Sequence, residues 1–203
     1  MGLEKEAQKR TSKNDSAHDF QHIIRVLKNA QKIARKEKAN VRLVTAAALL
    51  HDIVSYPKSD PRSKNSASES AKKAKKILAK YHYTKDEIET IADAICDHSF
   101  SRGIIPRSLE GKVLQDADRL DAVGAIGIAR TFSVGGAEGR PFYNKDDPFC
   151  KNRLPDDKSY TLDHFYKKLL LLEKKMNTKT GKIEAKKRTK ILKRFIGDLQ
   201  KEI

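Results

Sequence analysis

Apolar residues recur along most of the chain at intervals of three or four, which is the spacing of one face of an α-helix. No stretch alternates apolar and polar residues well enough to predict a β-strand. We therefore predict an all-α fold, a bundle of about six to eight helices. The expected helices cover about 15–36, 41–54, 66–81, 84–98, 109–132 and 162–176, with a last one after Gly181.

Capping residues and helix breakers divide these segments. Asp15 or Ser16 is suited to cap the first helix, and both Ser66-Ala-Ser-Glu69 and Thr84-Lys-Asp-Glu87 have the spacing of a capping box. Residues 1–14 are polar and are expected to fray. The stretch 133–160 is rich in glycine and proline, and a loop of that length is usually a functional lid or disordered.

Composition is compatible with one domain over residues 1–203, with a core at about 15–132 and C-terminal helices at about 161–203. No apolar run approaches 18 residues, and the N-terminus lacks the apolar region of a secretory signal, so no membrane partner is expected. Two cysteines, Cys96 and Cys150, do not suggest a disulfide framework, which fits a reducing cytoplasm.

The formal net charge of +16 permits contact with nucleic acid and would equally attract anionic nucleotides. Eight basic residues lie between Lys179 and Arg194. A solvated face of an amphipathic helix is the plainer interpretation of that run. Nucleic acid is therefore kept as an alternative partner and is not favoured.

The strongest candidate for chemistry is His51-Asp52, at the end of the apolar run that begins at Ala46. Burying an imidazole beside a carboxylate is costly unless both are paired or bind a metal. Partners are available in His18 and His22, which share a helix face, in His98, which follows an apolar stripe, and in the run Asp116 to Asp121. Divalent ions such as Mn²⁺, Fe²⁺, Co²⁺, Ni²⁺ and Zn²⁺ accept imidazole and carboxylate together.

The ordered motifs His22-Ile-Ile-Arg-Val, Leu-Leu-His51-Asp52-Ile and Gln-Asp-Ala-Asp118-Arg-Leu-Asp-Ala resemble the HD superfamily of metal-dependent phosphohydrolases. The continuation from Val123 to Phe132 and the Gly-Gly-x-x-Gly-Arg-Pro run at 135–141 are similar to its YedJ/YpgQ-like branch. The resemblance covers about residues 15–200. It implies an HD-domain-like helical bundle and one divalent metal ion, with Mg²⁺ added to the candidates above.

The resemblance also implies roles for individual residues. The metal ligands would be His22, His51, Asp52 and Asp118, with Asp116 and Asp121 as alternatives to Asp118. Asp52, His98 and Lys58 would be catalytic, His98 as an acid or phosphate contact and Lys58 as a phosphate contact, while Asp52 or a hydroxide on the ion would be the base. His18, Arg119 and Arg140 would contact substrate.

The activity implied is hydrolysis of a nucleotide or related phosphate ester, including the conversion of a nucleoside triphosphate to a monophosphate and pyrophosphate. A basic nucleic-acid-binding module with a structural metal is the alternative, and a nucleotide sensor that does not hydrolyse is a third. The sequence gives no indication of the metal, the substrate or the oligomeric state.

Overall fold

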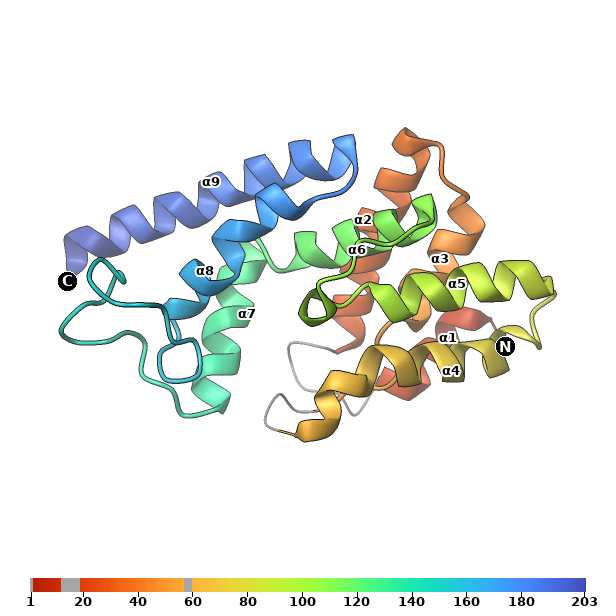
Figure 1. Cartoon of the computed structure of the whole chain (residues 1–203), viewed down its shortest axis with the longest axis horizontal. Helices are drawn as coiled ribbons and strands as arrows, with labels where there is room; N and C mark the ends of the chain where they lie inside the picture. The colour runs from red at the N-terminus through yellow and green to blue at the C-terminus, as the bar shows by residue number, and fades with distance from the viewer. Residues whose placement is uncertain (1, 12–18, 57–59) are drawn as a thin grey trace. The chain divides into compact units, whose positions relative to one another are not determined.

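The computed structural model describes residues 2–11, 19–56 and 60–203. Throughout these residues the regular structure is helical, with α-helices and short 3-10 helices and no strand (Figure 1). The all-α prediction is confirmed. The described helices include none that is long and apolar enough to span a membrane.

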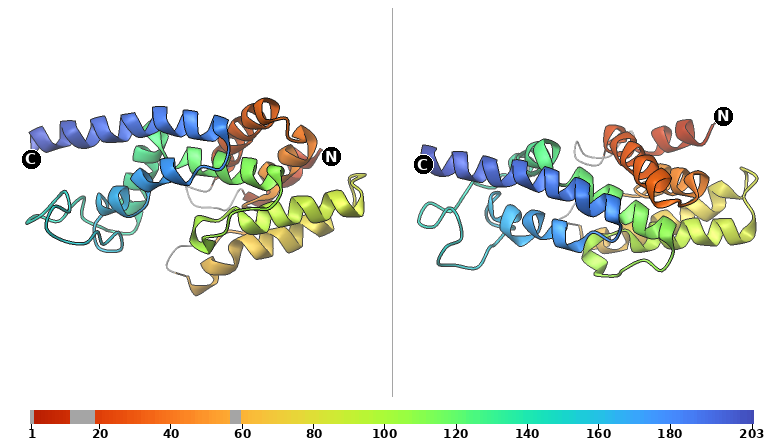
Figure 2. Two further views of the ribbon diagram at one scale, coloured as in Figure 1. Left: turned by 45° about the horizontal axis from the view of Figure 1, so that its top comes forward. Right: turned by 90° about the horizontal axis from the view of Figure 1, so that it is seen from above.

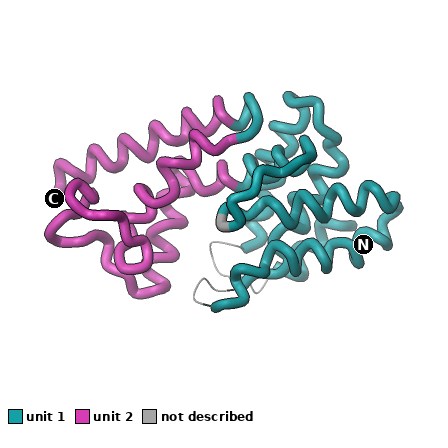
Figure 3. The backbone as a smooth tube through the Cα atoms, in the orientation of Figure 1, with its two compact units in different colours: residues 1–118, 177–181 teal, residues 119–176, 182–203 magenta. Residues whose placement is uncertain are grey.

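The chain divides into two compact units, coloured separately in Figure 3. The first contains residues 1–118 and 177–181, and the second contains residues 119–176 and 182–203. A single domain over 1–203 remains a prediction. The helices are α1 (Leu3–Thr11), α2 (Phe20–Glu37), α3 (Val41–Leu50), η1 (Pro61–Asn65), α4 (Ser66–Leu78), α5 (Lys85–Asp97), η2 (Phe100–Arg102), α6 (Leu109–Asp121), α7 (Gly124–Ala137), α8 (Asp163–Lys167), η3 (Leu169–Lys175) and α9 (Lys179–Glu202).

Helix α3 is the centre of the first unit, in contact with α1, α2, α4 and α5. Its residues Ala46, Ala47 and Ala48 are fully buried, and such small side chains let neighbouring helices approach closely. Helices α4 and α5 run side by side in Figure 1 and in both views of Figure 2. The first unit is therefore built around a short, alanine-rich central helix.

The N-terminal segment differs from the prediction. Residues 3–11 form helix α1 instead of fraying, and Ala7 and Thr11 are buried on its inner face. Helix α1 contacts both α2 and α3. Burial of this narrow apolar face supplies the stabilisation that so polar and short a helix lacks in isolation.

Two of the predicted helix starts are settled by the structure. The capping box Thr84–Glu87 is confirmed, with both reciprocal hydrogen bonds present. The one predicted from Ser66 is wrong, because η1 leads directly into α4 and Asn65 takes the cap position without a side-chain bond. Asp15 and Ser16 lie outside the described residues, and helix α2 is capped by Asp19.

The long helix predicted over 109–132 is two helices, α6 and α7. Val123 is extended, and Gly124 has a φ of +80°, a conformation that favours glycine. A Cβ on Gly127 would lie 2.3 Å from the carbonyl oxygen of Ala122, so a side chain there would collide with the bend. Helix α7 continues to Ala137, which shortens the predicted loop at 133–160 from its N-terminal side.

Aromatic side chains fill the core of the second unit. Phe132 on α7, Phe165 on α8 and Phe195 on α9 meet with ring centroids 5.7 to 6.1 Å apart. Phe142, from the segment after α7, packs edge-on against Phe132. This cluster joins three helices of the unit that are distant in sequence.

Candidate metal centre

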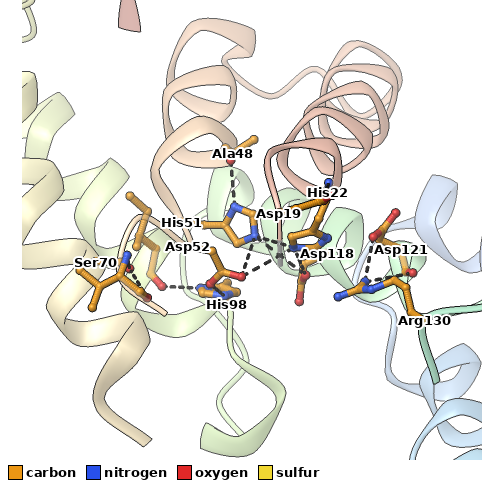
Figure 4. Close-up of polar contacts among 12 residues, drawn as sticks. Asp19, His22, Ala48, His51, Asp52, Ser70, His98, Asp118, Asp121 and Arg130 are labelled. Atoms are coloured by element: carbon orange, nitrogen blue, oxygen red, sulfur yellow. Dashed lines mark hydrogen bonds and ion pairs between the residues drawn. The ribbon is translucent and has the colours of Figure 1, made fainter. Parts of the chain in front are cut away.

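His51 and Asp52 lie just beyond helix α3, which ends at Leu50, four residues before the predicted end. His51 is fully buried, and its Nδ1 lies 2.8 Å from the carbonyl oxygen of Ala48 (Figure 4). A carbonyl only accepts hydrogen bonds, so Nδ1 carries the proton and the neutral ring presents a lone pair at Nε2. The helix end thereby fixes the tautomer that suits metal binding.

Helix α2 brings His22 to the same place. Its Nε2 lies 3.2 Å from Nε2 of His51, and its side chain is also fully buried. The backbone N–H of His22 donates to the Asp19 side chain, 2.9 Å away, which caps the helix. The first turn of α2 is therefore held in place where His22 enters the cluster.

Two carboxylates complete a group of four donors in the first unit. Asp52 Oδ2 lies 3.6 Å from His51 Nε2 and 3.7 Å from His22 Nε2. Asp118 Oδ1, from helix α6, lies 3.6 Å from His22 Nε2 and 4.0 Å from His51 Nε2. Asp118 keeps about a quarter of its side chain exposed, so the group is accessible from its side.

These spacings suit a divalent ion. Donor atoms about 2.1 Å from an ion lie roughly 3.0–3.4 Å from one another in octahedral or tetrahedral coordination. The two imidazole nitrogens, 3.2 Å apart, already lie in this range, and the separations of 3.6 to 4.0 Å between imidazole and carboxylate are slightly wider, so a small inward movement of the carboxylates would complete a site. Two imidazoles with two carboxylates match borderline divalent ions, and the donor set fits the group that the motifs imply.

The protonation states also favour an ion. Burial lowers the pKa of His51 to about 4, which leaves a neutral imidazole at neutral pH. Burial alone would raise the pKa of Asp52, but the neighbouring His51, His22 and His98 hold it well below its ordinary value. The pKa of Asp118 is lowered in the same way, because the same three imidazoles outweigh burial. Both carboxylates are therefore anionic.

His98 is a third buried imidazole at the cluster. Its Nδ1 donates to the carbonyl oxygen of Ile95, 2.6 Å away, and its Nε2 lies 3.6 Å from Asp52 Oδ1. Burial would lower the pKa of His98, but the bond to Asp52 outweighs it and raises that pKa. His51, Asp52 and His98 form a second group whose donor atoms all lie within 4.8 Å of one another. The predicted position of His98, on the stripe of Ile91 and Ile95, explains how it reaches the core.

The three aspartates of helix α6 have different partners. Asp116 accepts hydrogen bonds from the backbone and side chains of Asn177 and Thr178. Asp121 accepts from Arg130 at 2.8 Å. Only Asp118 contacts His22 and His51, so the geometry favours it over the two alternatives as a ligand.

The other predicted site residues lie outside the described residues or in the second unit. His18 and Lys58 lie outside the described residues. Arg119 and Arg140 belong to the second unit, where Arg119 donates to the carbonyl oxygen of Lys175 and Arg140 to that of Asp157. Arg140 also pairs with Glu138 at 3.0 Å. These contacts give both arginines roles in the local structure of the second unit.

Comparison with known proteins matches residues 19–123 to the HD domain. The chain is 35% identical to the Bacillus subtilis protein YpgQ over 192 residues, which cover 93% of this chain and 85% of the relative. A crystal structure of Bacillus subtilis YpgQ in complex with ADP superposes with a TM-score of 0.76 at 33% identity, over 99% of this chain and 93% of that one.

A crystal structure described as an HD-superfamily hydrolase, from Bacillus thuringiensis, gives a TM-score of 0.76 at 36% identity, over 98% of this chain and 94% of that one. The family match begins at the cap of α2 and ends just after α6. It therefore contains His22, His51, Asp52, His98 and Asp118. With these relatives matching over nearly their whole length, the chain belongs to the HD-domain family.

Proposed function

We propose that this protein is a metal-dependent phosphohydrolase that holds one divalent ion between His22, His51, Asp52 and Asp118. The observation that carries the proposal is the convergence, from three separate elements, of two imidazole nitrogens 3.2 Å apart, with one oxygen of each carboxylate 3.6 to 4.0 Å from both nitrogens. Membership of a family that includes proteins described as hydrolases supports the reaction class.

A nucleotide is the proposed substrate. A crystal structure of the relative YpgQ contains ADP, and that relative covers nearly the whole of this chain. We further propose that the reaction is the hydrolysis of a nucleoside triphosphate to a monophosphate and pyrophosphate. Because one fold and one ligand set serve many substrates, the substrate has to be identified by direct assay.

Each residue of the cluster has a distinct task in this proposal. His51 is locked through Ala48 so that its Nε2 stays unprotonated. Asp52 and Asp118 supply two negative charges, which a divalent ion balances. When bound, the ion would lower the pKa of a water molecule and neutralise charge on the phosphate. His98 is proposed to contact the substrate phosphate or to hold a proton at Nε2, the ring atom that faces Asp52.

The test is metal analysis followed by turnover measurements. Protein purified without chelator is assayed for metal content, and then against nucleoside mono-, di- and triphosphates with Mn²⁺, Mg²⁺, Co²⁺ and Ni²⁺. His51→Ala should lose both bound metal and turnover. His82→Asn is the matched control, because His82 is exposed and its positive φ of 54° is one that asparagine tolerates. Full turnover by His51→Ala would refute the site.

One observation favours a second candidate function. Helix α9 exposes seven lysines, and all of them but Lys201 form no ion pair with another residue that the structure describes. These six are Lys179, Lys182, Lys186, Lys187, Lys190 and Lys193. A nucleic-acid-binding surface there would give affinity that falls steeply with salt. A gel-shift titration at low and at physiological salt tests it, and no shift at low salt would exclude it.

A further inference from the structure

Helix α4 has one buried polar side chain on its otherwise apolar inner face. The residues buried on that face are Ala67, Ser70, Ala71, Ala74, Ile77 and Leu78. Ser70 has no exposed surface. A hydroxyl at such a position needs a hydrogen-bond partner, because burying it unpaired would destabilise the fold.

The partner of Ser70 is the backbone of Val54, two residues after Asp52. The Val54 N–H donates to Ser70 Oγ at 3.0 Å, and Ser70 Oγ donates to the Val54 carbonyl oxygen at 3.2 Å. One hydroxyl thus satisfies both backbone polar groups of a single residue. Figure 4 shows Ser70 close to Asp52 and His98.

Val54 lies in the turn that carries the His-Asp pair. Helix α3 ends at Leu50, and residues 51–54 form a turn beyond it that carries Asp52. Ile53 is buried and anchors the middle of the turn. The two hydrogen bonds with Ser70 fix the turn at Val54. Asp52 therefore lies between the end of helix α3 and a residue whose backbone is held in place.

The neighbouring residue of α4 makes a second contact with the same segment. Glu69 Oε2 accepts a hydrogen bond from the Tyr56 hydroxyl at 2.8 Å. Residues 69 and 70 of α4 therefore hold residues 56 and 54, respectively. Because the two contacts hold residues 54 and 56, they restrict both the position and the direction of the segment that follows Asp52.

We infer that Ser70 is a positioning residue for the metal centre, holding the 51–54 turn so that the Asp52 carboxylate faces His22 and His51. The inference rests on the proposed metal site. Removing the hydroxyl would leave the N–H and C=O of the half-buried Val54 without this partner, and the turn would relax to find others. Groups that orient metal ligands from outside the ligand set typically change affinity by about 10- to 100-fold when removed.

Mn²⁺ titration of the purified, chelator-treated protein tests this without reference to turnover, with free Mn²⁺ followed by electron paramagnetic resonance. Ser70→Ala is expected to weaken Mn²⁺ binding by about tenfold or more. Ser70→Thr keeps the hydroxyl and should recover most of the affinity. Ser68→Ala is the matched control on the same helix, because the exposed Ser68 hydroxyl donates to the carbonyl oxygen of Asn65 and should not affect Mn²⁺.

The outcomes separate this inference from the proposed function. If the wild-type protein bound no Mn²⁺, both the proposed metal site and the positioning role of Ser70 would be refuted. Wild-type binding with equal affinities for Ser70→Ala and Ser68→Ala would overturn only the positioning role, even if the melting temperature of Ser70→Ala were lower. Should Ser70→Ala not fold, Tyr56→Phe decides: loss of the outer bond is expected to weaken Mn²⁺ binding about two- to threefold, and unchanged affinity would overturn the inference.

Discussion

The Nε2 atoms of His22 and His51 lie 3.2 Å apart, and both side chains are fully buried. His51 uses its Nδ1 proton on Ala48, so its Nε2 lone pair points toward His22. This contact is favourable only with a proton or a cation between the two nitrogens. A divalent ion would convert it into two coordinate bonds.

Metal removal is therefore expected to destabilise the protein. An ion present at 100 times its dissociation constant adds about 2.7 kcal/mol to the free energy of unfolding. For a chain of this size that corresponds to roughly 5–10 °C in melting temperature. Thermal melts with Mn²⁺ and with excess chelator measure the difference.

The variant His22→Ala tests whether the stabilisation by Mn²⁺ comes from the proposed site. Its melting temperature should respond little to Mn²⁺, because one of the two convergent nitrogens is gone. An equal response in wild type and in His22→Ala would mean that the ion stabilises the protein from another site.

Asp118 and Asp121 should respond differently to the same substitution. Asp118→Asn removes a charge that faces two imidazoles, and we expect at least a tenfold loss of metal affinity with little loss of stability in the metal-free protein. Asp121→Asn breaks the ion pair between the buried Asp121 and the partly exposed Arg130, and should keep metal affinity while the free energy of unfolding falls by about 1–3 kcal/mol. Calorimetric titration and chemical denaturation of both variants test this, and metal loss confined to Asp121→Asn would reverse the assignment.

The sequence was sufficient to predict the class of fold and the elements that carry the candidate ligands. Helical periodicity is a local property, and His22, His51 and Asp118 lie at or next to the ends of apolar stripes that the core must bury. The roles of the three aspartates were not predictable from spacing. Those roles depend on Asn177 and Arg130, whose proximity to α6 is a product of tertiary structure.

Other features depended on information that the local pattern lacks. The break between α6 and α7 requires a positive φ at Gly124. The φ of a glycine within a helical pattern cannot be predicted from that pattern. The burial of Ser70 could have been predicted from the sequence, since Ser70 interrupts an apolar stripe between Ala67 and Ala74. Its partner Val54 could not be named, because the contact joins two segments 16 residues apart through a turn of unknown geometry.

Asp116 is expected to contribute to stability and not to metal binding. Its carboxylate accepts four hydrogen bonds from Asn177 and Thr178, at 2.7 to 2.9 Å. A Cβ on Gly181 would lie 2.3 Å from its Oδ2, so the segment after Met176 wraps closely around it. In Asp116→Asn an amide N–H₂ would face donors, and the free energy of unfolding should fall by about 2–4 kcal/mol.

Asp93→Asn is the control for this substitution, because Asp93 is exposed on α5. Urea denaturation of the two variants gives the comparison. If they unfolded at the same urea concentration, the Asp116 hydrogen bonds would have no net effect on stability.

Cys150 in the second unit offers a test based on pH. Burial, together with the nearby carboxylate of Asp163, raises the pKa of its thiol to about 11. The thiolate is the reactive form, and at pH 8 its fraction is about 0.1% for a pKa of 11, against roughly a quarter for a pKa of 8.5. The higher intrinsic reactivity of a more basic thiolate offsets only part of this difference.

In a Cys96→Ser background, alkylation of Cys150 by iodoacetamide at pH 8 should therefore be at least tenfold slower in the folded than in the unfolded protein. The rate for the folded protein should still rise close to tenfold per pH unit from 8 to 10, where the unfolded protein levels off above about pH 9. A folded-state rate that also levels off near pH 9 would show that limited access, and not the raised pKa, protects the thiol.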